Sequence, residues 1–216
     1  MERPKVQSIP LLSRQEQMLR RVFRRFNTLM VLFWRLGLGS WFNLWPALTG
    51  RILVLVHSGR KSGRRYYTPL NYALVDEEVY CVAGFGPAAD WYRNVLANPQ
   101  VEIWLPDGWW AAVAEEVIDA EKRWNLIKAV LKSSGLAAWL FGVSPGLDEP
   151  LLRQRTADYR VIQLRRVAAR TGRGGPGDLV WLWPLLTLWV WLRGRAALRR
   201  ARRRARGQHE RSPIRQ

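Results

Sequence analysis

Short strand-like segments separated by tight turns constrain the fold of this chain more than any other feature. They are rich in β-branched and aromatic residues, or they alternate apolar with polar positions. The segments occupy residues 52–57, 66–74, 79–83, 101–105, 109–117 and 159–164. Helical patterns begin at Asp90 and at Asp119, followed by a short apolar segment at 135–143 and a helical turn at 150–156. Five to six antiparallel strands with flanking helices predict a mainly β (α+β) chain built on a small barrel.

The turn between the first two strands is basic and contains two glycines. Its sequence is SGRKSGRR at 58–65. Glycine lets backbone amides approach an anion closely, while Arg, Lys and Ser supply charge and hydrogen-bond donors. A phosphate group is the natural ligand of such a turn, although a solvated hairpin tip has this composition about as often.

Four strings in the middle of the chain resemble a known family. They are SGRKSG at 58–63, TPL at 68–70, VAGFG at 82–86 and WYRNVLANPQV at 91–101. These strings are similar to those of the deazaflavin (F420)-dependent nitroreductase family of split β-barrel oxidoreductases. The resemblance extends over roughly 44–164 and implies a split β-barrel that binds the reduced deazaflavin coenzyme F420.

The resemblance also implies where the coenzyme binds. Its phosphate and acidic tail would meet the basic turn, and its ring would lie in a groove near the aromatic helix. The implied cofactor-binding residues are Arg60, Lys61, Ser62, Arg64, Arg65, Tyr66, Tyr67, Thr68, Pro69, Leu70, Asn71, Val82, Ala83, Gly84, Phe85, Asp90, Trp91, Tyr92, Arg93 and Asn94. Phe85 replaces a lysine of many relatives, and Leu152 aligns with a tyrosine thought to face substrate, so no catalytic residue is assigned.

The implied activity is hydride transfer from reduced deazaflavin to an apolar acceptor such as a quinone or a nitroaromatic. The coenzyme carries this chemistry, so the chain needs no catalytic triad. Two alternatives stay open: a flavin mononucleotide (FMN)-binding or non-catalytic deazaflavin-binding protein of the same barrel class, and a membrane-surface or nucleic-acid-binding adaptor. Barrels of this kind often pair, so a homodimer is compatible with the sequence.

The formal net charge of +18 is concentrated in three places, at 14–35, 60–65 and 193–215. Each place predicts an anionic partner, which can be a phosphate ligand, a membrane surface or nucleic acid. The single cysteine, Cys81, is expected to be a small core residue. His57 and His209 are the only histidines. No metal site is predicted, and His57 is expected to be a core or turn histidine rather than a catalytic one.

Both ends of the chain carry features outside the barrel. From Ser13, apolar residues recur every three or four positions between arginines, which predicts a basic amphipathic helix that either covers the barrel or lies on a membrane. Residues 179–192 hold four tryptophans and no charge, and 193–206 hold eight arginines. This pairing favours a peripheral membrane anchor over a basic tail, and nucleic acid less, because no base-stacking aromatics interrupt the arginines.

These features divide the chain into four predicted parts. Residues 1–43 form the basic helix and an approach loop, and 44–168 form the coenzyme-binding barrel. Residues 169–177 form a glycine-rich linker, and 178–216 form the Trp-rich segment and polybasic tail. Residues 1–10 lack the pattern of a secretory signal, so the expected location is the cytoplasm, at the inner face of the cell membrane.

Overall fold

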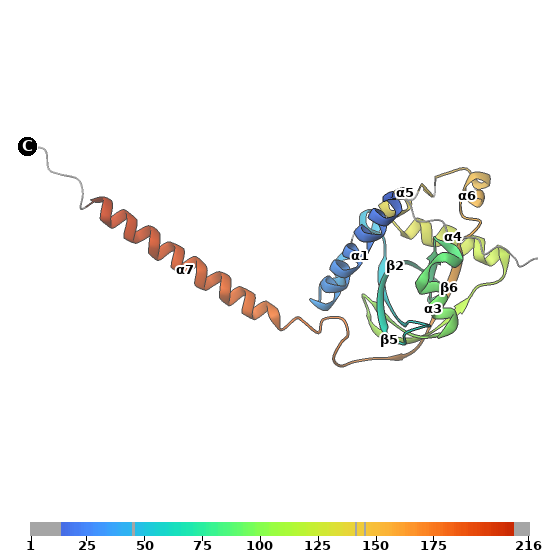
Figure 1. Cartoon of the computed structure of the whole chain (residues 1–216), viewed down its shortest axis with the longest axis horizontal. Coiled ribbons are helices and arrows are strands. Elements are labelled where there is room, and N and C mark those ends of the chain that lie inside the picture. The colour runs from blue at the N-terminus through green and yellow to red at the C-terminus, as the bar shows by residue number, and fades with distance from the viewer. Residues whose placement is uncertain (1–13, 45, 141, 145, 210–216) are drawn as a thin grey trace, which may run out of the picture.

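The computed structural model describes residues 14–44, 46–140, 142–144 and 146–209. Its centre is a closed antiparallel barrel with the strand order β1-β2-β3-β6-β5-β4, in which β4 pairs back onto β1 (Figure 1). The strands are β1 Ile52–Ser58, β2 Arg65–Val75, β3 Glu78–Ala83, β4 Gln100–Leu105, β5 Gly108–Glu116 and β6 Arg160–Ala169. The predicted fold class is therefore confirmed.

Helices flank the barrel and extend from it. They are α1 Arg14–Arg35, η1 Gly39–Asn43, α2 Pro46–Thr49, η2 Gly86–Ala88, α3 Asp90–Ala97, α4 Ala120–Ser133, α5 Leu136–Leu140, α6 Glu149–Arg155 and α7 Leu182–His209. The predicted helix at 119–133 is present as α4. Asp119 caps it, because its side chain accepts a hydrogen bond of 2.7 Å from the backbone N–H of Lys122.

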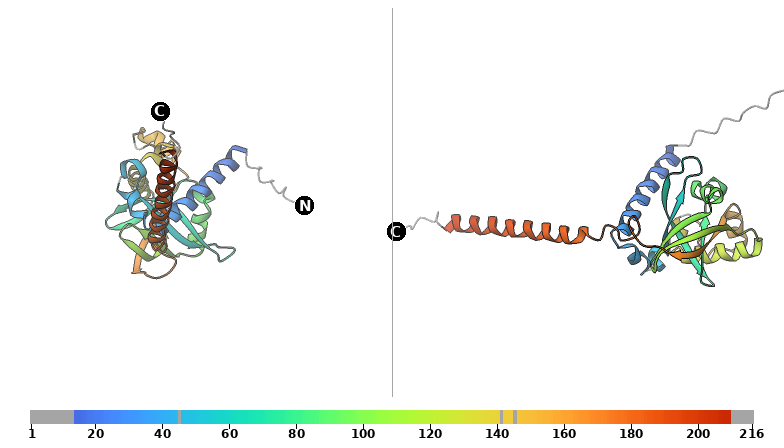
Figure 2. Two further views of the ribbon diagram at one scale, coloured as in Figure 1. Left: turned by 90° about the vertical axis from the view of Figure 1, so that its left-hand side faces the viewer. Right: turned by 90° about the horizontal axis from the view of Figure 1, so that it is seen from below.

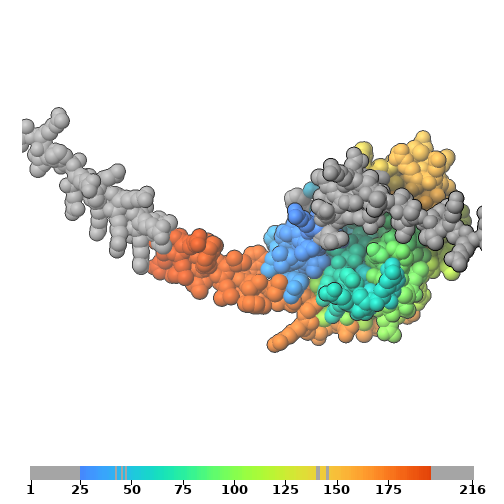
Figure 3. All heavy atoms as spheres, viewed as in Figure 1, coloured from blue at the N-terminus to red at the C-terminus, as the bar shows by residue number. Residues whose placement is uncertain are grey.

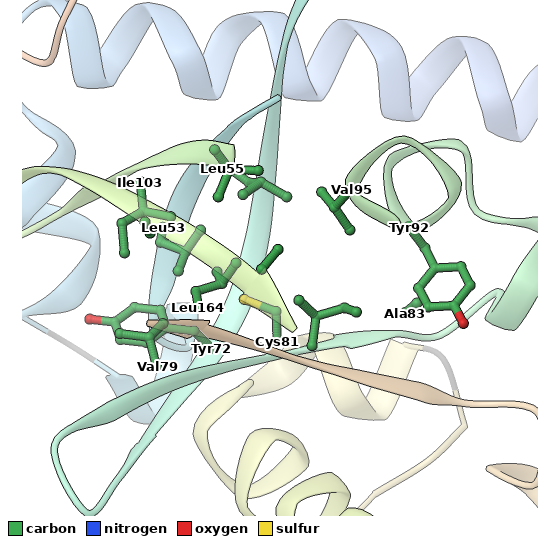
Figure 4. Close-up of a cluster of buried hydrophobic side chains, with 14 of the residues drawn as sticks. Leu53, Leu55, Tyr72, Val79, Cys81, Ala83, Tyr92, Val95, Ile103 and Leu164 are labelled. Carbon is green, nitrogen blue, oxygen red and sulfur yellow. The ribbon is translucent and has the colours of Figure 1, made fainter. Parts of the chain in front are cut away.

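Strand β1 is apolar from Ile52 to Val56 because both of its faces are covered there. Leu53 and Leu55 point into the barrel interior, where they meet Ile103 of β4 and Leu164 of β6 (Figure 4). Helix α3 closes one end of this interior with Tyr92 and Val95, as the same view shows. The predicted core residue Cys81 is fully buried there.

Helix α1 covers the outer face of β1. Met30 and Trp34 pack on Val54, Val56 and Trp104. The helix therefore does cover the barrel, which was one of its two predicted roles. Its other side remains open to solvent, since the side chains of Phe26, Leu29 and Leu32 are exposed.

Helix α7 joins the Trp-rich segment and the arginines into one continuous helix that projects away from the barrel (Figures 1 and 2). Its base is held by the end of α1. The Arg35 guanidinium donates to both carboxylate oxygens of Asp178 at 2.9 and 2.8 Å, and the Leu179 N–H donates to the Arg35 carbonyl at 2.9 Å. The indole of Trp183 donates to the Leu36 carbonyl at 3.0 Å.

Among the residues that the structure describes, no helix has both the length and the apolarity to cross a membrane. Just before α7, Gly175 is buried against the ring of Trp109. The end of the predicted linker is thus packed on the barrel, while the three boundaries between the four predicted parts stay predictions. The predicted features of 1–13 and 210–216 lie outside the described residues.

Candidate functional site

The barrel opens between β2 and β3. Strand β2 pairs with β1 along Arg65–Asn71, but with β3 only from Tyr72 to Val75. Strand β3 instead pairs with β6 from Val79 onward. One edge of β2 therefore has no strand partner over 65–71 within the described structure, and we call this opening the split. Pro69 lies there, which is where a strand tolerates proline, because a partner strand would need its missing N–H.

The predicted cofactor residues flank the split on three sides. Residues 66–71 form its β2 side, residues 82–85 lie at the end of β3, and α3 packs on the interior cluster that Leu70 of β2 also contacts. Strand alternation divides the β2 set between two faces. Leu70 packs against the interior cluster, whereas Tyr67 packs on the outer face with Trp104 at 5.4 Å between ring centroids. The structure thus brings only part of the predicted set to one surface.

Two of the four predicted cations of the turn are already engaged by the protein. The Arg60 guanidinium donates to the Asn94 side-chain oxygen at 2.9 Å and pairs with Asp90 at 3.3 Å. Arg65 pairs with Glu102 and lies over the ring of Tyr67. These two arginines hold the turn and β2 in place, and neither charge is fully available to a ligand.

The other two cations point into solvent. Lys61 and Arg64 are exposed, and neither side chain has an ion pair within the described residues. The backbone amides of the turn are largely used internally, because Gly59 N–H donates to the Arg64 carbonyl and Gly63 N–H donates to the Gly59 carbonyl, both at 2.8 Å. Anion binding at this turn therefore depends on the Lys61 and Arg64 side chains more than on an amide cradle.

Some residues of α3 lie in the core and others lie on the surface. The Tyr92 ring lies in the barrel interior and its hydroxyl donates to Glu116 at 2.7 Å, and burial, followed by this hydrogen bond, raises its pKa to about 12. Trp91 is half-buried against the same interior cluster. Asp90 and Arg93 are exposed and pair with each other at 3.0 Å.

The sequence reading missed the position of His57 in the site. Its ring is only 4% exposed and stacks on the ring of Tyr66, with 5.9 Å between centroids. Its two nitrogens lie 3.0 Å from Thr68 Oγ1 and 3.3 Å from the Asn94 amide nitrogen. Burial lowers the His57 pKa to about 4, against a smaller raising effect from the Ser58 backbone. The alternation from Leu53 through Leu55 to His57 could have placed it facing inward.

The surface of the protein has two hollows, of which one lies next to the basic turn. A depression of about 570 Å³ lies next to the turn, lined by Arg65, Glu102 and Arg170 among others. A smaller one of about 290 Å³ lies between α4 and α6. Leu152, which aligns with the substrate-facing tyrosine, is buried at this second place beside Trp124 and away from the split. That position therefore offers neither a hydroxyl nor a place at the split.

Residues 39–139, which contain the split, match the model of the F420H(2)-dependent quinone reductase family. The recognition made from the four strings is confirmed at this level, and the family is one of oxidoreductases. The F420H2-dependent quinone reductase match names F420 and gives no support to FMN, and it describes a quinone reductase rather than a nitroreductase.

Several solved structures are similar to this chain. A conserved hypothetical protein from Mycobacterium tuberculosis is 22% identical over 57% of this chain and 75% of its own, with a TM-score of 0.43. A protein described as an F420-H2 dependent reductase is 21% identical over 53% of this chain and 94% of its own, with a TM-score of 0.39. A putative pyridoxamine 5'-phosphate oxidase from Listeria innocua is 14% identical over 61% and 95%, with a TM-score of 0.40. No curated protein matches this chain in sequence.

The residues at the split fit the coenzyme that the F420H2-dependent quinone reductase family name implies. An anionic group finds two exposed cations at Lys61 and Arg64. A flat ring finds an unpaired strand edge at 65–71 and the half-buried indole of Trp91 nearby. Among the described residues, no group of three or more His, Cys, Asp or Glu side chains could hold a metal ion.

Proposed function

We propose that this protein is an F420H2-dependent oxidoreductase that transfers a hydride to an apolar acceptor of the quinone type. The observation that carries the proposal is the split itself, flanked by two cations without ion pairs inside the region that matches the quinone reductase family. When bound, the reduced deazaflavin supplies the hydride. The chain's task is to bind, orient and shield the reacting partners.

Each part of the site has a role in this proposal. Lys61 and Arg64 hold the anionic part of the coenzyme by charge-assisted hydrogen bonds. The free edge of β2 and the indole of Trp91 bind its ring, and the exposed side chains of Tyr66 and Phe85 provide apolar walls for an acceptor. Arg60 acts indirectly, since it fixes the turn to α3 through Asn94 and Asp90.

The proposal includes peripheral association with an anionic membrane surface. The first turns of α7 project away from the barrel (Figure 3), and their exposed apolar side chains include Leu185, Leu188, Trp189, Val190 and Trp191. The arginines that follow them along the same helix would meet lipid phosphates, at about 1 kcal/mol per cation near the surface. Lipid-soluble quinones reside in such a membrane, which places the acceptor near the enzyme.

The first test is a fluorescence titration of the full chain with oxidised F420 and, in parallel, with FMN. Micromolar or tighter binding of F420 with no comparable binding of FMN is expected. Steady-state reduction of a soluble quinone and of a nitroaromatic by F420H2 then identifies the acceptor class, with the quinone expected to react faster. Preference for FMN, or binding of neither coenzyme, would favour the non-catalytic or adaptor alternatives instead.

A further inference from the structure

A buried hydrogen-bond chain runs from the basic turn to the β2 side of the split. It starts at the Arg60 backbone and side chain, passes through Asn94 and His57, and ends at the Thr68 hydroxyl. Asn94 and His57 are 6% and 4% exposed, so water does not compete for these bonds. The proposed function uses the Arg60–Asn94 end of this chain to fix the turn, but it gives His57 and Thr68 no role.

The orientation of the Asn94 amide follows from its partners. Its side-chain oxygen accepts from the Arg60 backbone N–H at 3.2 Å and from the Arg60 guanidinium at 2.9 Å. Both partners can only donate, so the atom that they meet is the oxygen. The amide nitrogen is therefore the atom 3.3 Å from His57 Nδ1, and it donates to that ring nitrogen.

The tautomer of His57 follows in turn. Because Nδ1 accepts a hydrogen bond, it carries no proton, and a neutral imidazole then has its proton on Nε2. The lowered His57 pKa agrees with a neutral ring near pH 7. The Nε2–H therefore donates to Thr68 Oγ1 at 3.0 Å, and the threonine oxygen is the acceptor.

This assignment leaves the proton of the Thr68 hydroxyl without a partner. Within the described residues, Thr68 Oγ1 has no hydrogen bond other than the one to His57. The residue is half-buried and lies on the stretch of β2 that has a free edge, between Tyr66 and Leu70. A hydroxyl that already accepts a hydrogen bond is a stronger donor through its own proton.

We propose that Thr68 donates a hydrogen bond to a carbonyl oxygen of the coenzyme ring in the split, and that His57 and Asn94 are positioning residues for this donor. The inference rests on the proposed function, because it places the deazaflavin at the split. The same hydrogen-bond chain begins at Arg60 of the anion-binding turn, so the turn and the Thr68 donor are held at one fixed spacing. A ligand with an anionic group and a carbonyl-bearing ring is recognised at both ends.

The hydrogen-bond chain holds the Thr68 hydroxyl in position, but it cannot supply a proton to the reaction. If Thr68 lost its proton, only His57 Nε2 could reprotonate it. The buried His57 ring would then become an imidazolate anion, which is costly away from water. Asn94 cannot return a proton to Nδ1, since an amide N–H is far too weak an acid. The proton that accompanies hydride transfer must therefore come from water or from another group.

The test compares F420 affinity and the absorption spectrum of the bound coenzyme among full-length variants. Thr68→Val keeps the shape and removes the hydroxyl, so we expect about tenfold weaker binding and a shifted spectrum. Thr68→Ser keeps the donor, and both its affinity and its spectrum should stay close to those of the unchanged chain. Melting temperatures are measured for both, and Thr68→Ala, which also lacks the hydroxyl, takes the place of Thr68→Val if that variant does not fold.

A double-mutant cycle with His57→Gln separates positioning from a structural role. His57→Gln should weaken F420 binding when Thr68 is present and have no further effect in the Thr68→Val background, because it acts through the hydroxyl. Equal affinity and an equal spectrum in Thr68→Val, or strictly additive losses in the cycle, would overturn the proposal. If the unchanged chain binds no F420 at all, the proposed function fails instead, and that result is seen before any variant is made.

Discussion

Arg60 and Lys61 are neighbours in the turn, yet the fold uses them differently. Arg60 is bonded to Asn94 and Asp90, whereas Lys61 extends into solvent. The same contrast separates Arg65, paired with Glu102, from Arg64. A basic string in a sequence therefore overstates the charge that a ligand can reach, because some of its cations hold the protein together.

This division predicts different effects for neighbouring substitutions. Lys61→Ala combined with Arg64→Ala should weaken F420 binding by roughly 10- to 100-fold, since each lost charge-assisted bond is partly exposed. The matched control is Lys122→Ala with Lys132→Ala, which removes the same charge from exposed positions on α4. Fluorescence titration at one fixed ionic strength measures the F420 affinity of both double variants. An equal loss of affinity in the control would show that only the net charge of the protein matters.

His57 predicts how stability depends on pH. Its pKa is about 4 in the folded protein against 6.5 when unperturbed, so the unfolded chain takes up the proton first as the pH falls. The contribution is fully present above pH 6.5 and declines between pH 6.5 and 4, by about 3 kcal/mol in total. Tyr66, Thr68 and Asn94 contact the ring, and none supplies a negative charge that would stabilise the imidazolium.

Urea unfolding at pH 7.5, 5.5 and 4.5 measures this dependence. His57→Gln is the comparison, because it keeps a polar side chain that does not titrate. Its free energy of unfolding should change less than that of the unchanged chain over this interval. Parallel pH curves for the two proteins would contradict the assignment of the effect to His57.

At the scale of elements, the sequence predicted each strand because period-2 alternation and turn residues are local signals. The C-terminal end of β6 was missed, since Arg165 and Arg166 do not read as strand residues. They are held there by Glu115 and by Asp107, which are far away in the sequence. The role of His57 depends on α3 docking against β1, and no local pattern reports such a contact.

Gly135, in the loop between α4 and α5, lies where one added methyl group should strongly lower the free energy of unfolding. Gly135 has φ +55°, and a Cβ on it would lie 2.6 Å from the Gly50 backbone nitrogen and 2.9 Å from the Leu48 carbonyl oxygen. Gly135→Ala should therefore lower the free energy of unfolding by at least about 3 kcal/mol, from left-handed strain plus backbone collision.

Gly63 in the basic turn is the matched control for this substitution. It has a similar φ of +63°, but a Cβ there meets nothing within 4 Å. Gly63→Ala should cost only about 1 kcal/mol, which is the strain alone. Urea unfolding measures both variants, and equal losses would mean that the contact between the two loops contributes nothing.

At the scale of the whole molecule, the exposed indoles of α7 predict membrane binding. Replacing Trp189 and Trp191 by Ser in the full chain should reduce co-sedimentation with anionic phosphatidylglycerol vesicles by tenfold or more, because aromatic side chains anchor at the headgroup level. Trp139→Ser is the control, since this residue is even more exposed but lies on α5. Unchanged sedimentation of the α7 variant would remove the membrane from the proposed function.

The contact between α1 and the base of α7 has a mechanical consequence. The start of α7 is held to the end of α1 by the Arg35–Asp178 ion pair and by the hydrogen bond from Trp183, so the helix and the barrel rotate together as one rigid unit. If α7 lies along a lipid surface, this contact fixes which side of the barrel faces the lipid and which faces the aqueous phase. The protein then diffuses in the plane of the membrane with the same face of the barrel always turned toward the lipid. Breaking the Arg35–Asp178 pair would let the barrel rotate relative to α7 and lose this fixed orientation.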